Sequence, residues 1–269
     1  MIAADVAFTA VVLAGERASP ATDPLASAAG VASKVLVPIA GVAVIQRVIE
    51  TIEGCDRINR RMLVGPAATT LAAEPSLGAR IDSGKWTWLA PTESPAASAS
   101  AALDAIGTDG HILLTTADHA FLTPEMIHQF CSAALATGAD FAVGFVHRRD
   151  VLAKFPNTRR TGWHFSDDTY CGCNLFAVLR PAGHSVTVFW RHVEKQRKRP
   201  WRIMRMLGAG LFLRYIAGRL SLADALSELS RRTQCRIAPV MLAQPEAAVD
   251  VDSIEDWRLV NKTWAQLRG

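Results

Sequence analysis

The chain has 269 residues, half of them hydrophobic, which is enough to bury a sizeable core in one large domain. Its net charge of +4, from 29 basic and 25 acidic residues, does not single out a nucleic-acid partner, and we expect none. The five cysteines lack paired CxxC spacing, which favours reduced thiols in a cytoplasmic protein over disulfides or a zinc site. We expect no signal peptide and no spanning segment, because no apolar run approaches the ~20 residues that a bilayer requires.

The first element is an apolar run at residues 8–13, which predicts a buried parallel strand. Ala14 and Gly15 end this run, and a stretch rich in small residues, predicted to be a loop, leads to Lys34. Small residues let backbone N–H groups approach an anion closely, and a lysine adds a positive charge. This layout is typical of a phosphate-binding site.

Farther along the chain, strand-like runs alternate with helical segments, which predicts an α/β fold. We expect a Rossmann-like, mostly parallel central sheet flanked by helices, within a single domain that spans residues 1–269. Ligands on such sheets bind at the carboxyl ends of the strands. The expected strands are residues 61–64, 86–89, 111–116, 141–146, 170–178 and 237–242, and the expected helices start in or cover 44–52, 91–103, 123–125, 221–229 and 253–256.

The spaced pattern LAG-x-R…K-x-L-x-P-I-x-G resembles the signature of MobA-like nucleotidyltransferases. Glu16 replaces the family's second glycine, and Ala43 stands where the family usually has proline. The resemblance implies a fold of the nucleotide-diphospho-sugar transferase type. It also implies that Arg17 and Lys34 stabilise a triphosphate and its transition state. The matching residues at the nucleotide are Leu13, Ala14, Gly15 and Lys34.

A polar pair follows the predicted strand at 111–116. Asp118 lies where the resembling families carry an aspartate, which implies a Mg²⁺ ligand beside the triphosphate and a catalytic role. His119 either contacts a substrate phosphate or fills the place of the family's proline. Ser98, in the segment 91–103, either helps to hold base and ribose, as in the related cytidylyltransferases, or belongs to a helix start packed on the sheet.

Candidate acceptor-binding residues come from two later segments. Arg159 and Arg160 lie on a predicted loop near the cleft, where they either bind an acceptor phosphate or form a solvated basic edge. Related enzymes carry a G-x-N-like segment that contacts the acceptor, and Gly172 and Asn174 correspond to it. The alternative is a strand with a bulge at Gly172.

The segment 247–256 resembles the D-x-D-T-P-E-D ending of MobA-like proteins, where an acid or amide completes the metal site. Asp250 and Asp252 would point to the same side of a strand, and either one could be the second Mg²⁺ ligand. We expect Asp256 to interact with the dipole of the last helix instead.

Residues 190–236 form a basic insertion that the resemblance explains least. Twelve Lys or Arg and three acids lie between residues 191 and 236. The apolar and basic part at 195–219 could lie on an anionic membrane, or contact a substrate or a partner. The plainer interpretation is a helical subdomain with solvated arginines.

Together these features predict a Mg²⁺-dependent nucleotidyltransferase. It would join a nucleoside monophosphate from an NTP, with CTP favoured, to a phosphorylated small-molecule or lipid-linked acceptor and release pyrophosphate. One alternative is a glycosyltransferase of the same fold that uses a nucleotide-sugar. Another is a non-catalytic nucleotide-binding or membrane-associated regulatory protein, for which Glu16 is the main argument. A homodimer, and a peripheral position at the inner face of the membrane, are left open.

Overall fold

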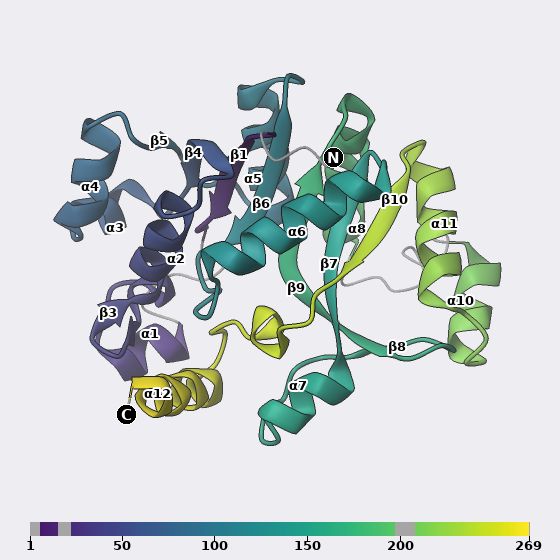
Figure 1. Ribbon diagram of the computed structural model, residues 1–269. Helices are drawn as coiled ribbons and strands as arrows, with labels where there is room; N and C mark the ends of the chain where they lie inside the picture. The colour runs from purple at the N-terminus through teal and green to yellow at the C-terminus, as the bar shows by residue number, and fades with distance from the viewer. Residues whose placement is uncertain (1–5, 16–22, 197–207, 269) are drawn as a thin grey trace.

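An eight-stranded sheet runs through the computed structural model, which describes residues 6–15, 23–196 and 208–268 (Figure 1). The strand order is β10-β7-β9-β6-β1-β4-β5, and the short β8 pairs with β9. Neighbouring strands on this path are parallel, except that β9 runs antiparallel to both β6 and β7. The predicted mostly parallel α/β sheet is therefore confirmed. The strands are β1 (Phe8–Leu13), β4 (Ile58–Val64), β5 (Thr87–Leu89), β6 (His111–Thr116), β7 (Phe141–His147), β8 (Trp163–His164), β9 (Thr169–Val178) and β10 (Ile237–Met241).

Helices cover both faces of this sheet, because both faces are apolar. Phe8, Ala10 and Val12 of β1 pack into one core, while Val11 and Leu13 pack into the other. Figure 1 shows α6 in front of the sheet and α5 and α8 behind it. The helices are α1 (Pro24–Ala29), α2 (Val44–Glu53), α3 (Ala68–Ala72), α4 (Pro75–Asp82), α5 (Pro95–Ile106), α6 (Pro124–Thr137), α7 (Arg148–Lys154), α8 (His184–Lys195), α10 (Ala209–Ile216), α11 (Leu222–Thr233) and α12 (Ile254–Arg268).

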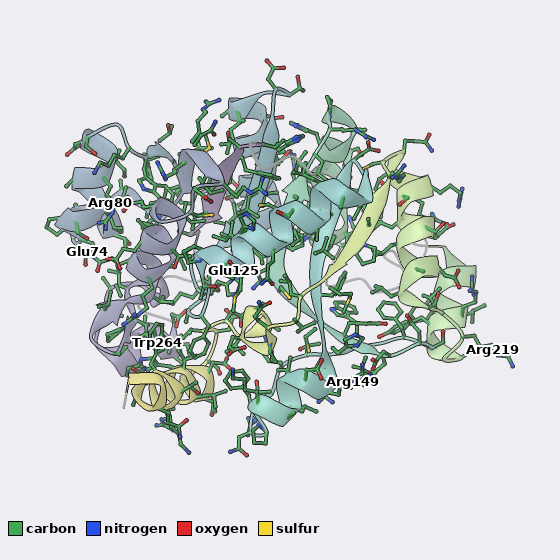
Figure 2. The ribbon with its side chains drawn as sticks, viewed as in Figure 1. Glu74, Arg80, Glu125, Arg149, Arg219 and Trp264 are labelled. Atoms are coloured by element: carbon green, nitrogen blue, oxygen red, sulfur yellow. The ribbon has the colours of Figure 1, made fainter. Side chains whose placement is uncertain are left out.

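Three 3₁₀ turns and one small hairpin complete the secondary structure of the described ranges. The turns are η2 (Lys34–Leu36), η3 (Pro181–Gly183) and η4 (Pro245–Ala248), and the hairpin joins β2 (Pro38–Ile39) to β3 (Val42–Ala43). The last helix packs back against this region, since Trp257 Nε1 donates to the Pro38 carbonyl at 2.8 Å. Farther along α12 lies Trp264, which is labelled in Figure 2. Its ring stacks on Phe121, and the Arg47 guanidinium lies over it.

The structure differs from the sequence-based expectation in three segments. The predicted loop before Lys34 contains α1, which forms because Asp23 accepts hydrogen bonds from Leu25 N and Ala26 N and Pro24 occupies the first turn. Residues 148–154 form a helix, α7, that was not among the expected ones, with Asp150 in its first turn and Lys154 in its last, while Arg159 and Arg160 follow it in irregular chain as expected. Residues 249–252 form no strand; they follow η4 as irregular chain.

Local signals predicted several other boundaries correctly. Thr123 caps α6 and Ser221 caps α11, each through its side-chain oxygen. In the basic insertion, α8, α10 and α11 are described, whereas residues 197–207 lie outside the described ranges. No helix in the described part of the chain combines the length and the apolar character that a bilayer crossing requires.

Candidate active site

A cavity of about 450 Å³ lies at the carboxyl edge of the parallel strands. It is bounded by the ends of β1 and β6, the starts of η2 and α5, one side of β9, α8, and the chain just before α12. Its position agrees with the general rule that ligands bind beyond the carboxyl ends of such strands. The predicted site residues that line it are Leu13, Gly15, Lys34, Ser98, Asp118, Asn174, Asp250 and Asp252.

Lys34 joins two carboxylates that are distant in sequence. Its Nζ lies 2.9 Å from Asp252 Oδ1 and 3.4 Å from Asp118 Oδ2. Ser33, which is fully buried, accepts a hydrogen bond from Val35 N and thereby starts the short η2 turn that presents the lysine. Burial lowers the pKa of Lys34, but the two carboxylates outweigh this effect and hold the pKa above its ordinary value. Lys34 therefore stays positively charged at neutral pH.

Asp118 is held in place by the backbone on both sides. Ala117 N donates to Leu13 O at the end of β1, and Val251 N donates to Asp118 O. The Asp118 side chain is 13% exposed, and its Oδ1 is buried with no hydrogen-bond partner among the described residues. A buried, unpaired carboxylate oxygen is costly unless a ligand completes it, so this atom is suited to a cation.

Asp250 and Asp252 have different surroundings, although the sequence did not separate them. The Asp250 side chain is only 6% exposed, and both oxygens are occupied: Arg160 Nη1 donates to Oδ1, and Asn174 Nδ2 donates to Oδ2 at 2.8 Å. The Asp252 side chain is 58% exposed and faces Lys34. Asp252 therefore has an accessible carboxylate for a metal, and Asp250 fixes the orientation of Arg160 and Asn174.

The end of β1 and the start of α5 form the opposite wall. Ser98 is buried, and its Oγ accepts a hydrogen bond from Thr92 N at 3.1 Å, which fixes the loop before α5. Gly15 lies across from it, because a Cβ there would be 3.9 Å from Ser98 Oγ. Ala14 is buried behind this wall.

Gly65 is a supporting residue that the sequence analysis did not single out as part of the site. It has a φ of +82°, and a Cβ there would come within 2.9 Å of the Ala14 backbone. A side chain at this position would displace the end of β1. The sequence signal that could have indicated this role is the glycine directly after the apolar end of β4.

Ala14 and Arg160 lie just behind the lining, and four further predicted site residues lie elsewhere or outside the described part. His119 is 1% exposed and does not line the cavity; burial lowers its pKa to about 4, and the charge of Arg160 acts in the same direction. Gly172 pairs with Phe145 of β7 and does not line the cavity. The irregularity in the pairing of β9 with β7 lies nearer Asn174, whose φ is +50°, than the predicted bulge at Gly172. Arg159 is exposed, and Arg17 lies outside the described ranges.

The sequence profile of the MobA-like NTP transferase domain matches residues 10–234. The chain belongs to this family. A hypothetical transferase from Thermus thermophilus has a similar structure, with a TM-score of 0.75 and 26% sequence identity over 94% of this chain and 100% of its own. A search among curated proteins finds no match to this sequence.

Two more distant structures share the fold of this MobA-like NTP transferase. One is a CMP:2-keto-3-deoxy-manno-octonic acid synthetase in complex with CTP, with a TM-score of 0.58 and 13% identity over 97% of this chain and 100% of its own. The other is a putative glucose-1-phosphate thymidylyltransferase from Bacillus anthracis, with a TM-score of 0.59 and 14% identity over 96% of this chain and 95% of its own.

Other lining residues of this family member gave no functional signal in the sequence. Thr115 and Thr116 end β6, and Phe176 and Trp190 come from β9 and α8. Threonines at a strand end and aromatic residues in apolar segments are usual core residues, so only the tertiary structure places them at the cavity.

Proposed function

We propose that this protein is a Mg²⁺-dependent nucleotidyltransferase that joins a nucleoside monophosphate from an NTP to a phosphorylated acceptor. The observation that carries this proposal is the convergence of Lys34, Asp118 and Asp252 at the carboxyl edge of the sheet, opposite the Ser98 wall. An acceptor phosphate oxygen would bond to the α-phosphorus while the bond to the β-phosphate oxygen breaks and pyrophosphate leaves. This corresponds to the nucleotidyltransferase class EC 2.7.7.

Charge supports the requirement for a divalent cation. Among the described residues that line the cavity, four are aspartates, namely Asp23, Asp118, Asp250 and Asp252, and Lys34 is the one cation. Such a cavity repels a triphosphate unless positive charge enters with it. No group of three or more metal-ligating side chains occurs in the described ranges, but Mg²⁺ commonly needs only one or two carboxylates in addition to substrate phosphates.

Asp118 and Asp252 are the residues we assign to Mg²⁺, because one has an unpartnered buried oxygen and the other an accessible carboxylate. When bound, the ion would neutralise charge on the phosphates. Lys34 would donate hydrogen bonds to the triphosphate and, together with Arg17, stabilise charge in the transition state. Because the acceptor is already an anion, no residue needs to act as a strong general base.

The remaining predicted residues divide into a nucleotide side and an acceptor side. Leu13, Ala14, Gly15 and Ser98 would form the nucleotide side, and the preference for CTP rests on the resemblance around Ser98. Asn174 and Arg160, both oriented by Asp250, would face the acceptor. Arg159, Gly172 and His119 are less suited to direct contact, because they do not line the cavity and, unlike Arg160, have no side chain bonded to a lining residue among those described.

A lipid-linked acceptor and a peripheral position on the membrane are the finer parts of the proposal. In the described part of the segment 195–219, α10 exposes Leu213 and Ile216, which are 65% and 67% accessible. Arg219 lies at the outer edge of the molecule beyond this helix (Figure 2). Apolar side chains flanked by cations are typical of a helix that lies on an anionic surface.

The experiment that tests the proposal is thermal unfolding with ATP, CTP, GTP and UTP, each with and without Mg²⁺, followed by a pyrophosphate-release assay. We expect one nucleotide to raise the melting temperature only with Mg²⁺, since a ligand of the native state stabilises it by mass action. Asp118→Asn should abolish the shift. Asp82→Asn, on the exposed end of α4, is the matched control that should keep it.

Other outcomes favour the alternatives. Stabilisation by nucleotide-sugars without pyrophosphate release would support a glycosyltransferase, and nucleotide binding without turnover of any acceptor would support a regulatory protein. Retention of the Mg²⁺-dependent shift in Asp118→Asn would refute the assigned metal site. Sedimentation of the same preparation tests whether the protein forms a homodimer.

A further inference from the structure

Two aromatic rings form one wall of the cavity. Phe176 comes from β9 and Trp190 from α8, and their ring centroids are 6.1 Å apart with planes inclined by 34°. Both side chains are only partly buried, so part of each ring faces the cavity. Partly exposed aromatic rings inside a cavity provide a flat apolar surface for a ligand.

The helix that carries Trp190 is fixed against the rest of the site. One turn after Trp190, Glu194 Oε2 accepts a hydrogen bond from Ala96 N in the first turn of α5. On the other side of the wall, β9 also carries Asn174, which is bonded to Asp250. The helix that carries Trp190 is thus fixed to the start of α5, and the strand that carries Phe176 also carries a proposed acceptor residue.

The two rings themselves offer little hydrogen bonding. The Phe176 ring has no polar atom and the Trp190 indole has one N–H donor. The polar side chains of the lining come from other positions around the cavity; they are the four aspartates, Lys34, Ser98, Thr115, Thr116 and Asn174. A sugar ring packed on this wall would lose water from the hydroxyl groups on that side without gaining partners from the rings, whereas an apolar body has no such groups to desolvate.

We propose that the Phe176–Trp190 wall binds the carbon body of the acceptor, and that this acceptor is the phosphate monoester of an apolar alcohol and not of a sugar. The inference rests on the proposed function, because it assigns the acceptor class of that same reaction. The acceptor phosphate would lie toward Asn174 and Arg160, and its aryl or prenyl group would pack against the two rings. Trp190 then determines acceptor specificity.

The test is isothermal titration calorimetry with phenyl phosphate, geranyl phosphate and glucose 1-phosphate. Each is titrated into the full-length protein with Mg²⁺ and a non-hydrolysable α,β-methylene analogue of the nucleotide that the thermal screen selects. We expect the two apolar phosphates to bind at least tenfold more tightly than glucose 1-phosphate. Trp190→Ala should weaken their binding about tenfold and leave binding of the nucleotide analogue unchanged.

Two further variants make the result specific. Trp163→Ala removes the same side chain from β8, where it is 54% exposed and outside the cavity, and should change neither affinity. Trp190→Phe keeps an aromatic face and should retain most of the affinity. If Trp190→Ala does not fold, Phe176→Leu tests the same wall from the strand.

Tighter or equal binding of glucose 1-phosphate would overturn the inference, as would unchanged affinity for both apolar phosphates in the wall variants. Loss of nucleotide-analogue binding in Trp190→Ala would overturn it as well, because the wall would then belong to the nucleotide. Failure of the proposed function itself gives a different result, namely no Mg²⁺-dependent nucleotide binding in the unsubstituted protein.

Discussion

Asp250 and Asp252 should respond in opposite ways to the same isosteric substitution. Asp250→Asn keeps the shape but removes the charge that faces the buried Arg160 guanidinium. Removing one partner of a buried ion pair usually costs 3–5 kcal/mol. Because asparagine still offers one oxygen and Arg160 is 18% exposed, we expect the lower end, about 3 kcal/mol. For a chain of this size that corresponds to a fall in melting temperature of roughly 6–12 °C.

Asp252→Asn should leave stability within about 0.5 kcal/mol, because its side chain is 58% exposed. It should instead raise the Mg²⁺ concentration needed for nucleotide-dependent stabilisation. Urea unfolding without ligand measures the first effect, and Mg²⁺ titration of the nucleotide-induced thermal shift measures the second. If Asp250→Asn moved the Mg²⁺ midpoint while Asp252→Asn did not, our assignment of the metal ligand would be wrong.

Three further predictions concern other parts of the molecule. The buried His119 has a folded-state pKa of about 4 against an ordinary value near 6.5, so the unfolded chain takes up its proton first as pH falls. The contribution of this group to the free energy of unfolding is complete above pH 6.5 and should decline toward pH 4, by about 2 kcal/mol at pH 5. Urea titrations in the presence of EDTA measure this decline, and His119→Gln should flatten it. An equally steep pH profile in the variant would exclude His119 as the cause. Lys34→Met should lower the melting temperature of the metal-free protein, because two facing carboxylates then lack their cation, and Mg²⁺ should partly restore it. A melting temperature that does not respond to Mg²⁺ would contradict a metal site shared by Asp118 and Asp252. Replacing Leu213 and Ile216 together by serine should reduce co-sedimentation with anionic vesicles, with neutral vesicles as the control, and should not alter unfolding, since both side chains are exposed.

The part of the candidate site around the ends of β1 and β6 could be predicted from the sequence because its signals are local. The apolar run 8–13 forms β1 with the expected bounds, and Asp118 follows β6 as predicted. In a parallel sheet these strand ends share one edge, so the position of Asp118 beside the end of β1 follows from chain order once the strands are recognised. The helix α1 was missed because its six residues are stabilised by one aspartate cap and one proline within a stretch that reads as a loop.

The arrangement around Asp250 and Trp190 could not be derived in this way, because its geometry depends on contacts between segments that are far apart in the chain. Asp250 and Asp252 are two residues apart and chemically identical, and they differ only because Arg160 and Asn174 reach one of them and Lys34 reaches the other. Trp190 belongs to a helix whose position is set by its packing on α5. The family, the sheet and the edge at which the candidate site lies could therefore be inferred from the sequence, while the tertiary structure was needed to show which carboxylate is accessible and which rings line the cavity. The physical reason is that burial and pairing are properties of long-range packing, which no local pattern records.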